Sequence, residues 1–219
     1  NILLYIMEYF DRIISLGQDC AVAANLRKFK FKDNTYPFDW NITNIKFIAD
    51  CFRTKFAIFN EIFDCLERSG NGRPKYKDRI YFYHDSMNLE CSITKNKYIR
   101  RSLRLHNLLC EDKKILFIRK APKDTIAQIQ HVIKLIRRNY PKLKFKILLI
   151  NNLKEKNINP DFIIHRYKDI KSFNKCENDH YIHNDELMGY KCVSDELKKI
   201  KSIKFKQPDK KIDDIRSES

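Results

Sequence analysis

A cysteine near the start of the chain stands where nucleophilic chemistry is favoured. Apolar residues 12–17 predict a short buried strand, and residues 20–27 predict a helix directly after it, with Asp19 as its expected N-cap. A thiol at a helix N-terminus faces unpaired N–H groups and the positive end of the helix dipole, which favour the thiolate. The same N–H groups, together with Gln18, can hold an oxyanion. Cys20 is therefore the candidate nucleophile, and a small buried cysteine is the alternative.

A general base for this thiol is expected among the histidines. His84 ends the apolar run 80–83, which places it at the rim of a sheet, where it can accept the Cys20 proton. A hydrogen-bonded structural role is the alternative for His84. Asp39 can orient the imidazole or cap the helix that follows it. His183, in the segment Asp-His-Tyr-Ile-His-Asn, is a second candidate base.

Alternating strands and helices must position these groups. This pattern predicts an α/β single-domain, three-layer fold with a mostly parallel sheet of about five strands and helices on both faces. The expected strands are residues 12–17, 80–84, 115–119, 145–150 and 162–165, with a helix over 124–140. Ligands of parallel sheets bind beyond the carboxyl ends of the strands. Arg119 ends one strand, so it is expected to bind a substrate carboxylate or phosphate.

The domain organisation follows from length and composition. A chain of 219 residues with 33% charged and 43% hydrophobic residues suits one folded domain, which we expect over residues 1–200. Residues 201–219 are polar with few apolar positions, which predicts a loosely ordered tail. The apolar opening is only six residues long, too short for a membrane span or a signal segment.

The cysteine and glycine patterns narrow the chemistry. Seven cysteines with no Cys-x-x-Cys pair predict free thiols in a reducing cytoplasm, without a zinc or other metal site. Only four glycines are present, and no Gly-rich phosphate loop is among them, so nucleotide chemistry of the P-loop kind is excluded. We expect no cofactor.

The net charge suggests an anionic partner. The formal charge is +16, and the run Lys28 to Lys32 interleaves lysine with phenylalanine. Such a chain can bind an anionic substrate, or nucleic acid through phosphate contacts and aromatic stacking. A lysine-rich solvated surface is the alternative.

Two motifs carry a resemblance to a known family. The start Ser-Leu-Gly-Gln-Asp-Cys, ending at Cys20, is followed by the loop Tyr-Pro-Phe-Asp-Trp at residues 36–40. This pairing resembles the family described as "putative papain-like cysteine peptidases", and the likeness extends over residues 13–150. The resemblance implies a cysteine hydrolase with Cys20 as nucleophile, His84 as base and Asp39 as orienting acid.

The sequence therefore predicts a cysteine-dependent enzyme, either a peptidase-like hydrolase or an acyl hydrolase or transferase. The alternative is a basic module that binds nucleic acid or a phosphate ligand without cysteine catalysis. In that case Arg119 meets the phosphate and Cys20 is structural.

Overall fold

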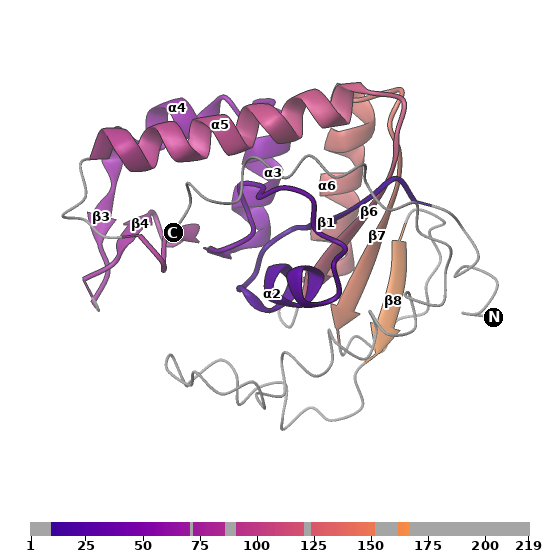
Figure 1. Ribbon diagram of the computed structural model, residues 1–219, viewed down its shortest axis with the longest axis horizontal. Coiled ribbons are helices and arrows are strands. Elements are labelled where there is room, and N and C mark those ends of the chain that lie inside the picture. Colours follow the sequence, from indigo (N-terminus) through magenta and orange to yellow (C-terminus); the bar gives the residue numbers. More distant parts are fainter. Residues whose placement is uncertain (1–9, 71, 86–90, 121–123, 152–161, 167–219) are drawn as a thin grey trace.

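The computed structural model describes residues 10–70, 72–85, 91–120, 124–151 and 162–166 (Figure 1). Its elements, in chain order, are β1 (Arg12–Ser15), α2 (Ala21–Lys28), β2 (Ile42–Thr43), α3 (Ile45–Arg53), α4 (Ile58–Glu61), the 3-10 helix η1 (Ile62–Cys65), β3 (Glu67–Arg68), β4 (Pro74–Tyr76), β5 (Ile80–Tyr81), α5 (Cys91–Cys110), β6 (Lys114–Lys120), α6 (Ile126–Asn139), β7 (Lys144–Asn151) and β8 (Phe162–Arg166). The protein is an α/β protein with two sheets.

The first sheet is parallel, with the strand order β1-β6-β7-β8. Alternate side chains of each strand face opposite sides of the sheet. Ile13 and Ile118 pack against α2 on one face. Ile14 and Phe117 join the core formed with α3, α5 and α6 on the other face. Helices therefore cover both faces, as the sequence predicts.

The second sheet is antiparallel, with the order β2-β5-β4-β3, and it corrects the prediction of one sheet of about five strands. Residues 80–84 do not join the parallel sheet. Ile80 and Tyr81 pair with β4 across a tight turn at Lys77 and Asp78, both of which have positive φ. A turn this short joins antiparallel neighbours, whereas a parallel pair needs a long crossover. The apolar run by itself does not distinguish these pairings.

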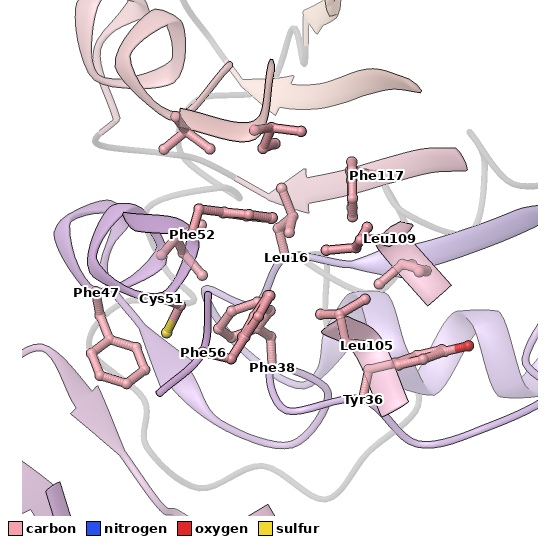
Figure 2. Packing of buried hydrophobic residues seen from close by; sticks show 14 of the residues in the cluster. Leu16, Tyr36, Phe38, Phe47, Cys51, Phe52, Phe56, Leu105, Leu109 and Phe117 are labelled. Atoms are coloured by element: carbon pink, nitrogen blue, oxygen red, sulfur yellow. The ribbon is translucent and has the colours of Figure 1, made fainter. Parts of the chain in front are cut away.

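The larger core is aromatic and lies between the parallel sheet and helices α3, α5 and α6. Phe52 is fully buried, and its ring packs edge-on against those of Phe56, Phe117 and Tyr140. Figure 2 shows Phe52 and Phe56 beside Phe117, which comes from β6. Aromatic rings, and not aliphatic side chains alone, therefore form the contact between these helices and the parallel sheet.

The structure corrects two predicted helix caps and adds one at α6 that the sequence did not indicate. Helix α6 lies within the predicted 124–140 segment and begins with a capping box between Thr125 and Gln128. The N-cap of α3 is Asn44, whose side chain accepts a hydrogen bond from the amide of Phe47, so Asp39 is not the cap of this helix. At α2 the N-cap position belongs to Cys20 and not to Asp19.

Several predictions concern residues outside the described ranges. His183, the boundary at residue 200 and the tail 201–219 all lie there. Within the described ranges, no helix combines the length and apolar character needed to cross a membrane.

Candidate active site

The loop after β1 has a backbone conformation in which Gly17 cannot be replaced by a residue with a side chain. Gly17 has φ +71°, and a Cβ added there would lie 2.0 Å from Oγ1 of Thr43, so a side chain cannot be accommodated. Gln18 also has positive φ, at 82°. Its amide donates a 3.1 Å hydrogen bond to the same Thr43 Oγ1. The close approach of β2 therefore turns the chain sharply just before Cys20.

Cys20 lies immediately before the first residue of α2. Asp19 accepts a 2.8 Å hydrogen bond from the amide of Ala21 through its side chain, so it satisfies one of the N–H groups at the start of the helix. The amides of Gln18 and Ala21 thus already have protein acceptors. This leaves the amides of Asp19 and Cys20 as main-chain donors for the predicted oxyanion site.

The structure brings Cys20 and His84 together across 64 residues of sequence. Sγ of Cys20 lies 3.1 Å from Nε2 of His84. The thiol is half-buried at the edge of the parallel sheet, while the imidazole is exposed and follows β5 of the antiparallel sheet. The pair therefore forms where the two sheets meet, at hydrogen-bond distance for a sulfur and a ring nitrogen.

Burial reverses the thiol pKa that the helix position predicts. Loss of water contact, with the Asp19 carboxylate as a second cause, raises the pKa of the Cys20 thiol from 9.0 to about 12, although its own backbone amide and Lys120 act in the opposite direction. The expected lowering by the helix dipole is therefore outweighed, because desolvation penalises the thiolate more strongly than the helix start stabilises it. Deprotonation of Cys20 is therefore aided by a base close by.

Two rings flank the imidazole. The rings of Trp40 and His84 lie 6.0 Å apart, nearly perpendicular to each other. Tyr83 packs against His84 in a similar way at 5.9 Å. Trp40 belongs to the Tyr-Pro-Phe-Asp-Trp loop, so this motif contributes a wall of the site, a role that the sequence analysis did not assign. The ammonium of Lys32 lies 4.8 Å above the Trp40 ring.

Asp39 lies buried behind this wall. Its carboxylate accepts a 2.6 Å hydrogen bond from the amide of Tyr36 and pairs with the Lys32 ammonium at 2.7 Å. Burial raises the pKa of Asp39, and Lys32 opposes that rise. These contacts to Lys32 and Tyr36 close the Tyr36–Trp40 loop. Lys32 also points into this site and away from the surface position that nucleic-acid binding requires.

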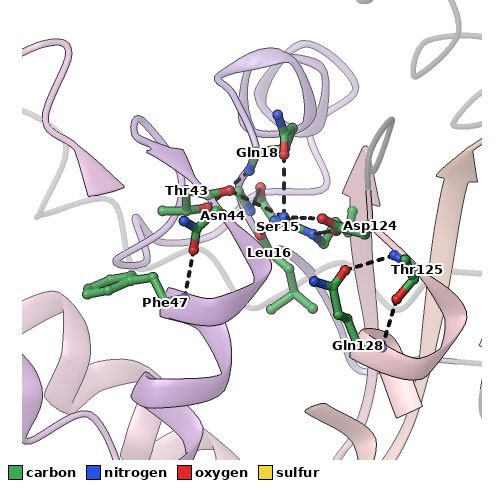
Figure 3. Close-up of polar contacts among 11 residues, drawn as sticks. Ser15, Leu16, Gln18, Thr43, Asn44, Phe47, Asp124, Thr125 and Gln128 are labelled. Atoms are coloured by element: carbon green, nitrogen blue, oxygen red, sulfur yellow. Dashed lines mark hydrogen bonds and ion pairs between the residues drawn. The ribbon is translucent and has the colours of Figure 1, made fainter. Parts of the chain in front are cut away.

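Arg119 supports the Cys20 loop from the buried side of the sheet. Its guanidinium is fully buried and donates to the carbonyl oxygen of Leu16 at 2.7 Å. It also reaches Oε1 of Gln18 at 3.4 Å and pairs with Asp124. Figure 3 shows Leu16, Gln18, Thr43 and Asp124 gathered at this point. The guanidinium is thus held by protein groups, and the substrate contact expected of Arg119 stays a prediction.

Lys120 supports the same loop from the opposite face of β6. Its ammonium lies 2.6 Å from Oδ2 of Asp19, and its side chain is only 5% exposed. Because consecutive side chains of a strand alternate, Arg119 and Lys120 contact the loop on either side of the strand. The end of β6 thus holds both sides of the turn that precedes Cys20. The sequence places Arg119 at this strand end but does not indicate this role for it or for Lys120.

A metal site is not evident in the described part of the chain. No group of three or more His, Cys, Asp or Glu side chains there has the arrangement of a metal site.

Comparisons with known proteins agree with the prediction of a cysteine-dependent enzyme. Residues 11–155 match the model of the family described as "Putative papain-like cysteine peptidase". A curated protein of Acanthamoeba polyphaga mimivirus, described as uncharacterised, is 29% identical over 172 residues, which is 64% of this chain and 77% of that protein. No solved structure matches.

Proposed function

We propose that this chain, which belongs to the papain-like cysteine peptidase family, is a cysteine-dependent hydrolase or acyl transferase with Cys20 as nucleophile and His84 as general base. The observation that carries the proposal is the 3.1 Å distance between Sγ and Nε2. Nucleophile and base must lie within hydrogen-bond reach to act together.

The resting thiol and the exposed imidazole define the first step. Because burial and Asp19 hold the Cys20 pKa high, the thiol gives up its proton as it attacks, and Nε2 of His84 receives it. The sulfur bonds to the substrate carbonyl carbon, and the carbonyl oxygen becomes an oxyanion. The amides of Asp19 and Cys20, with the side-chain amide of Gln18, are the proposed donors to that oxyanion.

The second step returns the proton. The tetrahedral intermediate collapses to a thioester, and the leaving amine or alkoxide takes the proton from the His84 imidazolium. Water, or another acyl acceptor, then gives its proton to Nε2 and attacks the thioester, which releases the acyl product and restores the thiol. Atoms and protons balance with water as the only co-reactant.

Arg119 and Asp39 enter this proposal as positioning residues. Arg119 holds the Leu16 carbonyl and the Gln18 side chain, so it maintains the turn that presents Cys20. Asp39 holds Lys32 and the Tyr36 amide, so it maintains the loop that carries Trp40 against the imidazole. The orienting contact to His84 expected of Asp39 stays a prediction.

Thiol alkylation tests the pair without a known substrate. The rate at which iodoacetamide labels each cysteine is measured by mass spectrometry from pH 5 to pH 10, in the natural protein and in His84→Ala. We expect His84→Ala to slow the labelling of Cys20 at pH 7 by about tenfold or more, because the buried thiol loses its base. Cys65, which is exposed, is the internal control and should label at the same rate in both proteins.

An acyl transfer assay tests the reaction class. p-Nitrophenyl acetate should acetylate Cys20 at about one equivalent and then turn over, and His84→Ala should abolish this. Equal Cys20 labelling with and without His84 contradicts the dyad. An acetyl group found only on other cysteines contradicts Cys20 as nucleophile.

The nucleic-acid alternative has no contact that favours it. Phe31 of the Lys28–Lys32 run is buried and packs with Phe29 in the core under α2, so these rings are not presented for stacking on bases. Two results together would favour nucleic-acid binding. The Cys20→Ala variant would still be retained on single-stranded RNA, and the natural protein would not be acetylated.

A further inference from the structure

A buried tyrosine on α5 lies behind the Cys20–His84 pair. The Tyr98 side chain is 1% exposed. Its hydroxyl oxygen lies 2.8 Å from Oδ1 of Asn41 and 2.9 Å from Oδ2 of Asp85. The hydroxyl has one proton, which is shared between these two acceptors. Asn41 and Asp85 belong to segments 44 residues apart in sequence, so the hydroxyl lies where the two segments meet.

Each acceptor is the chain neighbour of a ring at the site. Asn41 follows Trp40, and Asp85 follows His84. The Trp40 and His84 rings are packed together at 6.0 Å. A shift of either backbone segment therefore moves one ring relative to the other and changes the distance from Nε2 to the thiol.

The phenol ring is held independently of its hydroxyl. It stacks on Phe59 at 6.0 Å and packs against Phe82 at 4.8 Å. Burial and the neighbouring Asp85 carboxylate raise the pKa of Tyr98 well above its usual value, so the hydroxyl keeps its proton and can donate. Removal of the oxygen alone should leave the core packing largely in place.

The two acceptors have further anchors of their own. Nδ2 of Asn41 donates a 2.6 Å hydrogen bond to the carbonyl oxygen of Pro37, inside the loop that carries Trp40. The other carboxylate oxygen of Asp85 pairs with Lys97, one residue before Tyr98 on α5. These contacts thus connect α5 to the segment that carries Trp40 and to the segment that carries His84.

We propose that Tyr98 is a positioning residue for the reaction, whose hydroxyl fixes the His84 segment against the Trp40 segment and so holds Nε2 beside the Cys20 thiol. This inference rests on the proposed function. It adds a residue that makes no contact with the thiol and acts through the segments that carry His84 and Trp40.

The test is a double-mutant cycle on Cys20 alkylation in the full chain. Tyr98→Phe is combined with His84→Ala, and iodoacetamide labelling of Cys20 is followed against pH. We expect Tyr98→Phe to slow labelling about three- to tenfold at pH 7 when His84 is present, a factor that corresponds to one lost hydrogen bond. In the His84→Ala background it should change nothing, because the imidazole that it holds beside the thiol is gone.

Tyr140→Phe is the matched control. Tyr140 is also a buried tyrosine, and its hydroxyl bonds Nδ1 of His106 at 2.9 Å. It follows α6 and precedes β7, so it lies toward the amino ends of the parallel strands, opposite the end that carries Cys20. We expect Tyr140→Phe to leave the Cys20 labelling profile unchanged.

The double-mutant cycle distinguishes a failure of this inference from a failure of the proposed function. If His84→Ala slows labelling and Tyr98→Phe does not, the role of Tyr98 is refuted and the dyad stands. If Tyr98→Phe slows labelling equally with and without His84, the substitution acts by loosening the fold around Cys20, and the positioning role is refuted. If His84→Ala has no effect, both proposals fail. If Tyr98→Phe does not fold, Asp85→Leu removes the hydrogen bond between Tyr98 and the His84 segment from the other partner. It should also slow Cys20 labelling only when His84 is present.

Discussion

Three glycines allow the strain of the Cys20 loop to be measured in parts. Gly70 has an ordinary φ and open space around it, so Gly70→Ala should be neutral or stabilise by about 0.4–1 kcal/mol through a stiffer unfolded chain. Gly72 also has open space but a φ of +77°. Gly72→Ala should therefore cost the backbone penalty alone, about 1–2 kcal/mol.

Gly17 combines the same backbone penalty with a steric clash. An alanine Cβ there would lie 2.0 Å from Oγ1 and 3.3 Å from Cβ of Thr43. Overpacking of this kind costs about 1–3 kcal/mol, on top of the 1–2 kcal/mol or so for φ. We expect Gly17→Ala to lower the free energy of unfolding by about 2–5 kcal/mol, the sum of those two costs.

Urea denaturation of the single variants and of Gly17→Ala in a Thr43→Ala background is the assay. Thr43→Ala removes the oxygen that causes the closest contact, so the cost of Gly17→Ala should fall toward that of Gly72→Ala. Equal costs for Gly17→Ala and Gly72→Ala in the natural background would refute the claim that Thr43 enforces the turn. A cost that persists fully after Thr43→Ala would refute it as well.

Four further substitutions have predictable effects. Asp19→Asn should lower the pKa of Cys20 by removing a carboxylate that disfavours the thiolate, and Lys120→Met should raise it, so the pH midpoints of Cys20 alkylation should move in opposite directions. A shift of both midpoints the same way would contradict this. Thr125→Ala removes the capping box of α6 and should cost about 1 kcal/mol in urea unfolding, and no loss would contradict the cap. Phe52→Ala empties a fully buried site among three rings and should cost about 3–5 kcal/mol, and a cost below about 1 kcal/mol would show that the core collapses to fill it.

Local sequence was enough to select Cys20 and His84 as candidates, with His183 as a second candidate base. Cys20 is recognisable because an apolar strand and a helix leave it at the turn between them. His84 is recognisable because it ends an apolar run at a sheet rim. Both inferences use only neighbours in the chain, and strand ends and helix starts are properties of neighbours.

The partners of the buried charges could not be read in the same way. The guanidinium of Arg119 could face a ligand or the protein, and only the packing of β1, β2 and α6 around it decides that it binds Leu16, Gln18 and Asp124. Asp39 likewise meets Lys32 through the fold of the loop between them. Charge type predicts that a partner exists, whereas its identity depends on contacts distant in sequence.

The thiol at the strand-to-helix turn, the imidazole at a sheet rim and the α/β class were thus determined by the sequence itself, because each follows from periodicity and local order. Only the tertiary structure decided that residues 80–81 join a second sheet, that the Tyr98 hydroxyl meets Asn41 and Asp85, and that the thiol pKa rises. The physical reason is the same for all three. Strand pairing, shared hydrogen bonds and desolvation depend on which distant segments close over a residue, and no local pattern records that.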